Sequence, residues 1–138
     1  MKVVLDTNVL VSGLLSPFQA PGEIVRMTSA GTLQICYDAR IISEYEKVLA
    51  RPKFGFDLVS VEALLDEIKA SGFQAAGQPL ARPLPDIHDE PFLQAAIAAK
   101  VVCLITGNLK HYPPACRQGV EVLSSKNFLD FYRKYRKS

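Results

Sequence analysis

The sequence predicts a single three-layer α/β domain over residues 1–138, with a parallel sheet of about four to five strands flanked by helices. Short aliphatic and β-branched runs alternate along the chain with longer segments of amphipathic spacing. Strands separated by helices pair in parallel, because each helix carries the chain back across the sheet. A chain of 138 residues with 49% hydrophobic and 22% charged residues is typical of one globular domain with one core.

The first quarter of the chain contains two expected strands and two expected helices. Lys2–Leu5 is a continuous apolar run, which predicts a buried strand. Asn8–Leu15 is expected to be a helix that Pro17 helps to end. Gly22–Ala30 follows a proline and precedes Gly31, so it is expected to be a second helix that ends at that glycine. Leu33–Tyr37 is the second expected strand.

The middle of the chain is expected to hold two helices and then a segment without helix. Asp38 is expected to cap a helix that continues to about Ala50, with its apolar residues on one face. A second amphipathic helix is expected at Val59–Ala70. Gly72–His88 contains three prolines and is not expected to be helical; it is either an extended edge segment or a long loop.

The last third of the chain repeats the alternation of helix and strand. The expected elements are a helix at Phe92–Lys100, a strand at Val101–Ile105, a strand at Val120–Leu123 and a closing helix at Ser125–Tyr135. This order of elements supports the α/β prediction.

The three cysteines and the hydropathy of the chain favour a cytoplasmic protein. Cys36 and Cys103 lie in apolar strand-like runs, and Cys116 completes an odd number without metal-type spacing, so reduced thiols are expected. No apolar stretch approaches the roughly 20 residues that a membrane span requires, so no membrane partner is expected.

An acidic residue follows the first expected strand. Open α/β sheets bind ligands at the carboxyl ends of their strands, which is where Asp6 stands. The alternative is that Asp6 only caps the helix that follows. Thr7 and Asn8 either support Asp6 by hydrogen bonding or form an ordinary turn.

Three further carboxylates recur near the starts of later helices. Glu44 lies close to the apolar face of its helix, although it also fits the exposed margin of that face. Asp86 and Asp89 bracket the entry to the Ala-rich helix, where they are metal ligands or simply a turn residue and a cap. We expect these acids to converge at one edge of the sheet.

Such a group of oxygen ligands suits Mg²⁺ or Mn²⁺, which act on phosphate esters. His88 and His111 lack the spacing of a zinc site. Thr106-Gly107-Asn108 is too short to be a glycine-rich phosphate loop.

Charge is distributed unevenly along the chain. Residues 1–99 hold 8 Lys and Arg against 12 Asp and Glu, whereas residues 100–138 hold 8 against 2. An acidic site beside a basic surface suits a polyanion such as RNA. The alternative, which is equally expected, is that the basic closing helix is simply exposed to solvent. Candidates for contacts with RNA phosphates are Lys110, Arg117 and the Arg133–Lys137 cluster, which includes Lys134 and Arg136. Tyr112 either stacks on a base or packs in the core.

Several segments together resemble PIN-domain proteins, and the resemblance runs over residues 2–131. Its most specific parts are Val3-Val4-Leu5-Asp6-Thr7-Asn8-Val9-Leu10-Val11-Ser12-Gly13 and Leu104-Ile105-Thr106-Gly107-Asn108. Ser43-Glu44-Tyr45, Asp86-Ile87-His88-Asp89-Glu90-Pro91-Phe92-Leu93 and the closing Val122-Leu123-Ser124 and Phe128-Leu129 fit the same pattern. The subgroup that the chain resembles is the VapC-like toxins of prokaryotic toxin–antitoxin pairs.

The resemblance implies a Rossmann-like fold and a divalent-metal-dependent endoribonuclease acting on single-stranded RNA. It implies metal binding and catalysis by Asp6, Glu44 and Asp89, metal binding by Asn108, a looser role for Asp86, and support from Asn8 and Thr106. It also implies a small cognate antitoxin as partner and a homodimer. The fourth acidic position of the family, commonly Asp, is Asn108 here, which removes one negative charge from the site.

Two other functions compete with this interpretation. One is a PIN fold that binds RNA or a partner without cutting, because the loss of charge at Asn108 weakens the metal site. A phosphorylated receiver domain would need an acidic pair after the first strand and a lysine after a late strand, and the sequence has only Asp6 at the first place.

Overall fold

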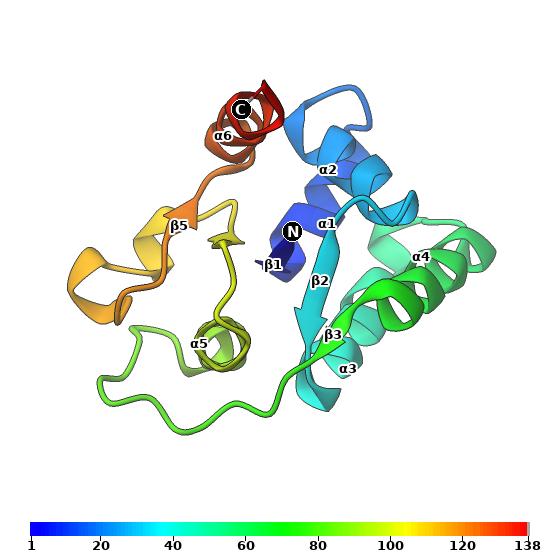
Figure 1. Ribbon diagram of the computed structural model, residues 1–138. Helices are drawn as coiled ribbons and strands as arrows, with labels where there is room; N and C mark the ends of the chain where they lie inside the picture. The colour runs from blue at the N-terminus through cyan, green and yellow to red at the C-terminus, as the bar shows by residue number, and fades with distance from the viewer. Residues whose placement is uncertain (138) are drawn as a thin grey trace.

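The computed structural model describes residues 1–137 and contains one sheet of five parallel strands (Figure 1). The strands are β1 (Lys2–Leu5), β2 (Gln34–Tyr37), β3 (Phe73–Gln74), β4 (Cys103–Ile105) and β5 (Val122–Leu123). Their order across the sheet is β3-β2-β1-β4-β5, and each neighbouring pair is parallel. All five carboxyl ends therefore lie along one edge of the sheet.

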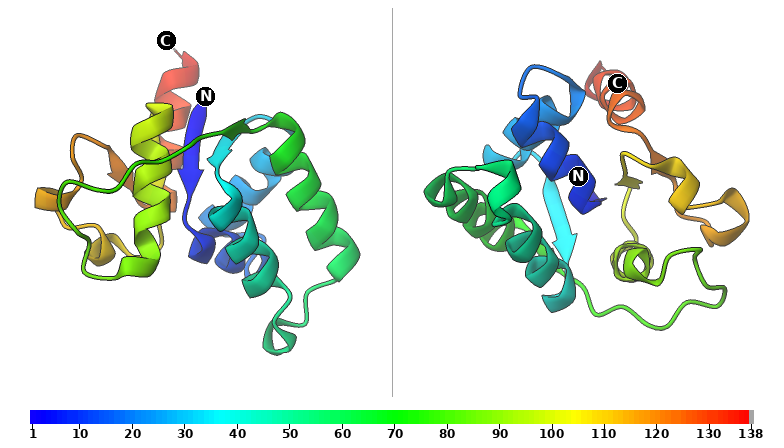
Figure 2. Two further views of the ribbon diagram at one scale, coloured as in Figure 1. Left: turned by 90° about the horizontal axis from the view of Figure 1, so that it is seen from below. Right: turned by 180° about the vertical axis from the view of Figure 1, so that it is seen from behind.

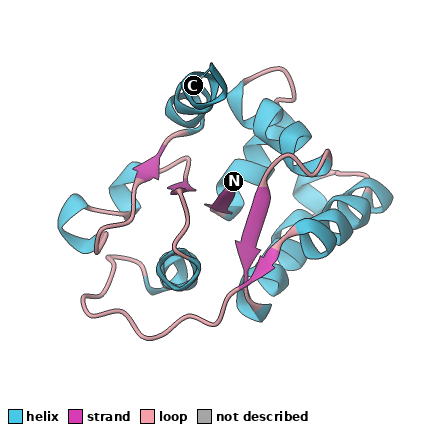
Figure 3. Cartoon of the chain, in the orientation of Figure 1, coloured by secondary structure: helices cyan, strands magenta, loops and turns pink. Residues whose placement is uncertain are grey.

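Helices cover both faces of this sheet (Figures 1 and 3). They are α1 (Thr7–Leu15), α2 (Ala20–Ser29), α3 (Ala39–Leu49), α4 (Leu58–Ser71), α5 (Glu90–Ala99) and α6 (Ser125–Lys137). α5 packs on β1, β2 and β4, whereas α1, α2 and α6 lie on the opposite side, with α4 against α2 and β2. The predicted three-layer α/β fold is confirmed. Within residues 1–137, no helix combines the length and apolar character needed to cross a bilayer.

The central strand is enclosed from both sides, which explains its uninterrupted apolar sequence. Val3, Val4 and Leu5 have no exposed surface. Helices α1 and α2 approach closely at Gly13, where an added Cβ would lie 2.4 Å from a side-chain carbon of Val25. This close packing fixes β1 and α1, and it thereby fixes Asp6, which lies between them.

Most predicted elements are confirmed, with shifts of a few residues at their ends. As expected, Asp38 caps α3, its Oδ1 accepting a hydrogen bond of 3.0 Å from the backbone N–H of Ile41. All three cysteines are free, and Cys36 and Cys103 are buried.

The segment 72–88 contains both an edge strand and a long loop, which were the two predicted alternatives. It differs from the prediction at one point. Phe73 and Gln74 form the edge strand β3, and most of the remainder is loop. The expectation that the segment holds no helix is wrong at its end, since Ile87–Asp89 form the 3₁₀ turn η2. Asp86 stabilises this turn, because its Oδ1 accepts a hydrogen bond of 2.9 Å from the backbone N–H of His88. The other 3₁₀ turns are η1 (Pro52–Phe54), η3 (Leu109–His111) and η4 (Pro114–Cys116).

Candidate metal centre at the carboxyl edge of the sheet

Asp6 follows β1 directly and is 5% exposed. It occupies the N-cap position of α1, but its side chain makes no capping hydrogen bond. Its Oδ2 instead accepts hydrogen bonds from Thr106 Oγ1 at 2.9 Å and from the Tyr112 hydroxyl at 3.1 Å. Burial raises the pKa of Asp6, the two hydrogen bonds oppose that rise, and the nearby charge of Glu44 adds to it. This carboxylate is therefore held in place by hydroxyl donors, and it forms no ion pair with a basic side chain among residues 1–137.

Glu44 reaches the same region from α3. It is half-buried, and it accepts a hydrogen bond from the hydroxyl of Thr7, the residue after Asp6. The neighbouring Tyr45 is fully buried and donates to the carbonyl oxygen of Leu5 at 2.5 Å. α3 is thereby fixed to the end of β1, which brings Glu44 near Asp6.

Asp89 stands at the start of α5 and is 9% exposed. Its side chain makes no capping hydrogen bond, and its buried Oδ2 has no hydrogen-bond partner among the described residues. His111 Nδ1 lies 2.8 Å from this oxygen, and the two groups form an ion pair when the imidazole is protonated. Burial, and then the charge of Asp6, raises the pKa of Asp89 to about 6, although His111 acts in the opposite direction.

The turn after β4 supplies the remaining predicted ligand. The Asn108 side chain is half-buried, and its backbone N–H donates to Thr106 Oγ1 at 3.0 Å. Asn8 accepts a hydrogen bond of 2.8 Å from the backbone N–H of Gly107, which ties the start of α1 to this turn. Thr106 thus links the turn to Asp6, and Asn8 supports the turn.

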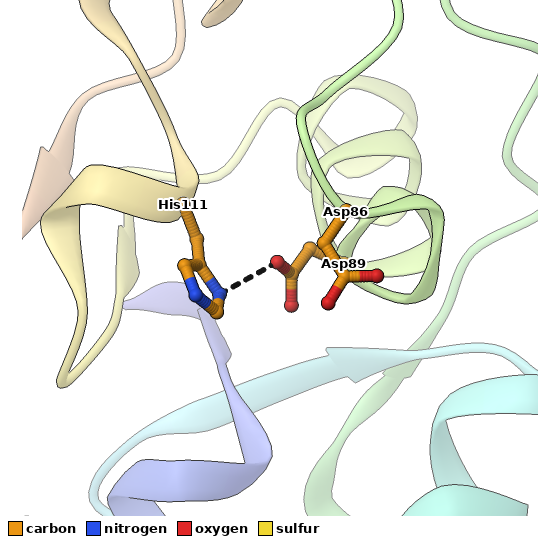
Figure 4. Close-up of side chains that lie close together, drawn as sticks. All are labelled: Asp86, Asp89 and His111. Carbon is orange, nitrogen blue, oxygen red and sulfur yellow. Dashed lines mark ion pairs between the residues drawn. The ribbon is translucent and has the colours of Figure 1, made fainter.

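Asp86 lies with Asp89 and His111 in a compact group (Figure 4). Among residues 1–137, this is the one group of at least three His, Cys, Asp or Glu residues whose ligand atoms all lie within 4.8 Å of one another. Asp6 and Glu44 are not members of this group, although the charge of Asp6 raises the pKa of Asp89.

Two residues near the acids were missed as site residues by sequence reasoning. His111 was set aside because it lacks zinc-type spacing, although it follows Asn108 by only three positions. Tyr112 was expected to pack or to stack on a base. It is fully buried, and its hydroxyl is a donor to Asp6.

The predicted RNA contacts fall into two places. Lys110, on η3, is exposed and lines a shallow depression together with Asn108 and Lys126. Arg133 pairs with Glu23 of α2, at 3.1 Å. Figure 2 shows that α6 runs away from the carboxyl edge and ends beside the N-terminus, so its last turns lie away from Asp6.

Three other predicted basic contacts have different surroundings. Arg117 Nε donates to the carbonyl oxygen of Tyr112 at 2.8 Å, which holds the loop after η3. Lys134 and Lys137 lie on the exposed last turns of α6. Lys110 is therefore the predicted contact that shares a surface depression with Asn108.

The residues at this edge fit a hard divalent cation. Carboxylate and amide oxygens are the donors that such cations prefer. The charge of Glu44 raises the pKa of the buried Asp6, and the charge of Asp6 raises the pKa of the buried Asp89. Asp89 Oδ2 also lacks a hydrogen-bond partner among residues 1–137. A cation would offset both costs.

Comparisons with known proteins agree with this architecture. Residues 2–110 match the family described as the PIN domain. The crystal structure of PAE2754 from Pyrobaculum aerophilum is similar to this chain with a TM-score of 0.52 and 14% identity, over 94% of this chain and 87% of that one, which shows a shared fold. A comparison with curated proteins gave no match. Because the family match covers most of its length, this chain belongs to the PIN domain family.

Proposed function

We propose that the protein is a divalent-metal-dependent endoribonuclease that hydrolyses phosphodiester bonds of single-stranded RNA. PIN domains are generally metal-dependent nucleases, and this chain has the nuclease-like fold. The observation that carries the proposal is the pair of buried carboxylates, Asp6 and Asp89, whose negative charges repel each other at the carboxyl edge of the sheet.

Mg²⁺ or Mn²⁺ would be held by Asp6, Glu44, Asp89 and Asn108, with Asp86 nearby. When bound, the cation would activate water and offset the charge that develops on the phosphate oxygens. Thr106 and Tyr112 orient Asp6 by donating to one of its oxygens. Glu44, which accepts a hydrogen bond from Thr7, would hold the cation or orient its water.

RNA would approach along the depression that Lys110 and Lys126 line. Lysines at such a position bind phosphates by charge and position the strand without reading its bases. Arg133 and Lys134 would contact only an RNA long enough to follow α6 to the other end of the domain. Arg133 would also have to leave its ion pair with Glu23.

The test is cleavage of single-stranded RNA with Mn²⁺ by wild type and by Asp6→Asn. The variant keeps the shape of the side chain and removes its charge, so cleavage should fall by at least about a hundredfold. Asp66→Asn is the matched control, because Asp66 lies on α4 with a side chain 65% exposed. Equal cleavage by wild type and Asp6→Asn would refute the proposal.

A second function is favoured by one residue. Asn108 offers an oxygen but no charge, so a PIN fold that binds RNA or a protein without cutting also fits the chain. Binding of RNA without cleavage by wild type, and cleavage gained in Asn108→Asp, would identify this second function.

The toxin role belongs to the same proposal. It includes a small antitoxin as partner, a homodimer and a cytoplasmic location, which the three free cysteines suit. Growth arrest on expression, relieved by the protein of the adjacent reading frame, would support the toxin role. Analytical ultracentrifugation tests the dimer, and a sedimentation coefficient of the monomer at micromolar concentration would refute it.

A further inference from the structure

Two helices begin at the depression that Lys110 and Lys126 line. Its border includes Ala20 and Pro21 in the first turn of α2, and Ser125 and Lys126 in the first turn of α6. These helices have 10 and 13 residues and lie side by side (Figure 1). The amino end of a helix carries a partial positive charge, so both helices favour an anion in the depression.

The backbone at the start of α6 has N–H groups to offer such an anion. Ser124 caps the helix, because its Oγ accepts a hydrogen bond of 3.1 Å from the backbone N–H of Asn127. Its carbonyl oxygen accepts the first hydrogen bond of the helix, at 2.9 Å, from Phe128. Within residues 1–137, the backbone N–H groups of Ser125 and Lys126 have no acceptor.

The side chain of Ser125 points to a ligand independently of the helix. The residue is 8% exposed, and its hydroxyl makes no hydrogen bond with any other residue of the described chain. Among residues 1–137, Asp89 Oδ2 is the one fully enclosed side-chain oxygen or nitrogen without a hydrogen-bond partner, so the Ser125 hydroxyl is not sealed in the core. Because Ser125 lines the depression, its hydroxyl opens there. An acceptor in the depression would offset the cost of leaving this largely buried hydroxyl unpaired.

The charged side chains around the depression are basic. Lys110 and Lys126 are exposed and form no ion pair with any described residue. Within residues 1–137, no Asp or Glu lines the depression. The neighbouring hollow between α2 and α6, in contrast, is lined by Glu23 and Asp130 as well as by basic residues. The depression at the start of α6 is therefore the part of this surface that suits an anion.

We propose that the first turn of α6, with Lys110 and Lys126, binds a phosphate group of RNA that neighbours the one cut. The Ser125 hydroxyl and the backbone N–H groups of Ser125 and Lys126 would donate to the phosphate oxygens, and the two lysines would supply charge. Thr106 lines the depression and donates to Asp6, so this subsite adjoins the proposed metal centre. The inference rests on the proposed function only for the origin of the phosphate in RNA.

The test is binding of a short unstructured RNA to the whole protein in a chelating buffer, followed by fluorescence anisotropy at several salt concentrations. Ser125→Ala should bind about tenfold more weakly, because a hydrogen bond to a charged group is lost. Its slope of log affinity against log salt should stay that of wild type, because the hydroxyl carries no charge. Lys126→Gln should also bind more weakly, and its slope should fall by about 0.7.

Ser29→Ala and Lys100→Gln are the matched controls. Both residues are exposed, Ser29 at the end of α2 and Lys100 at the end of α5, away from the first turns that border the depression. Both controls should keep the affinity and the salt slope of wild type. Urea unfolding shows whether each variant is folded, and the exposed Lys126 tests the proposal even where Ser125→Ala is not.

Two RNAs that differ only in a 5′-phosphate or a 5′-hydroxyl separate the sources of the phosphate. An equal loss of affinity for both RNAs in Ser125→Ala would assign an internal diester to the subsite. A loss for the 5′-phosphorylated RNA alone would assign a terminal monoester. Either result supports a phosphate site at the start of α6.

Two outcomes would overturn the proposal. One is Ser125→Ala binding both RNAs as tightly as wild type, and the other is a salt dependence of Lys126→Gln parallel to that of wild type. Cleavage with Mn²⁺ is measured separately on the same variants. Cutting by wild type with unchanged RNA affinity in Ser125→Ala would refute this inference alone, whereas weakened binding in Ser125→Ala without cutting by wild type would refute only the proposed nuclease.

Discussion

Asp89→Asn should stabilise the metal-free protein at pH 7, because Asp89 is a buried carboxylate close to Asp6. Its pKa is raised from 3.8 to about 6 in the folded state. The folded protein therefore binds more protons than the unfolded chain between about pH 4 and pH 6, and stability falls as pH rises through that window. The difference of about 2.2 pKa units corresponds to at most about 3 kcal/mol.

The expected gain is smaller than this limit. Asp86 and His111, which face Asp89 from its own turn and from η3, are partly exposed, so solvent screens part of the interaction. Asparagine also loses the attraction to His111. We therefore expect a gain of about 1–2 kcal/mol at pH 7, which corresponds to about 3–6 °C in melting temperature for a chain of this size.

Urea unfolding in a chelating buffer at pH 5 and pH 7 measures the effect. The gain from Asp89→Asn should be larger at pH 7, because the wild-type carboxylate carries most of its charge only there. Asp66→Asn, on an exposed surface of α4, should change stability similarly at both pH values. A variant that is less stable than wild type at pH 7, by more than at pH 5, would refute the reasoning and show that the contact with His111 dominates.

Three other changes test separate parts of the structure. Tyr112→Phe removes a donor to the buried Asp6 and should cost about 1–3 kcal/mol of unfolding free energy, and an unchanged urea midpoint would contradict this role. Gly13→Ala should cost about 1–3 kcal/mol by overpacking against α2, more than the roughly 1 kcal/mol gained in helix propensity, whereas Ser12→Ala on the exposed side of α1 should be nearly neutral. Lys110→Ala should weaken RNA binding and reduce the slope of log affinity against log salt by about 0.7; a parallel line would show that no phosphate contact is lost.

The fold was predictable because its signals are local. The strand at the centre is a continuous apolar run, and Asp38 caps α3 as its position before an amphipathic segment indicates. β3 was less predictable, because it has only two residues and both are exposed, so it carries no burial pattern. The turn η2 depends on a single side-chain hydrogen bond within a proline-rich segment.

The contacts within the site could not be read from the sequence. Thr106 and Tyr112 bond to Asp6 across about a hundred positions, and only the register of β1 against β4 brings them together. The direction of α6, in contrast, could have been predicted from the topology. A helix of 13 residues that starts at the carboxyl edge of a parallel sheet carries its last turn about 18 Å away at 1.5 Å per residue, so Arg133 and Lys134 move away from the acids.

The two hydroxyl donors to Asp6 also restrict how this carboxylate meets a cation. Both bond to Oδ2, and an oxygen that accepts two hydrogen bonds has little lone-pair density left for a metal. Asp6 should therefore bind through Oδ1 alone. Single-oxygen binding suits small octahedral ions, whereas Ca²⁺ gains from carboxylates that offer both oxygens. The two hydroxyls should therefore lower the affinity of the site for Ca²⁺ relative to Mn²⁺. Ca²⁺ binding as tight as that of Mn²⁺ would show that Asp6 turns to present both oxygens.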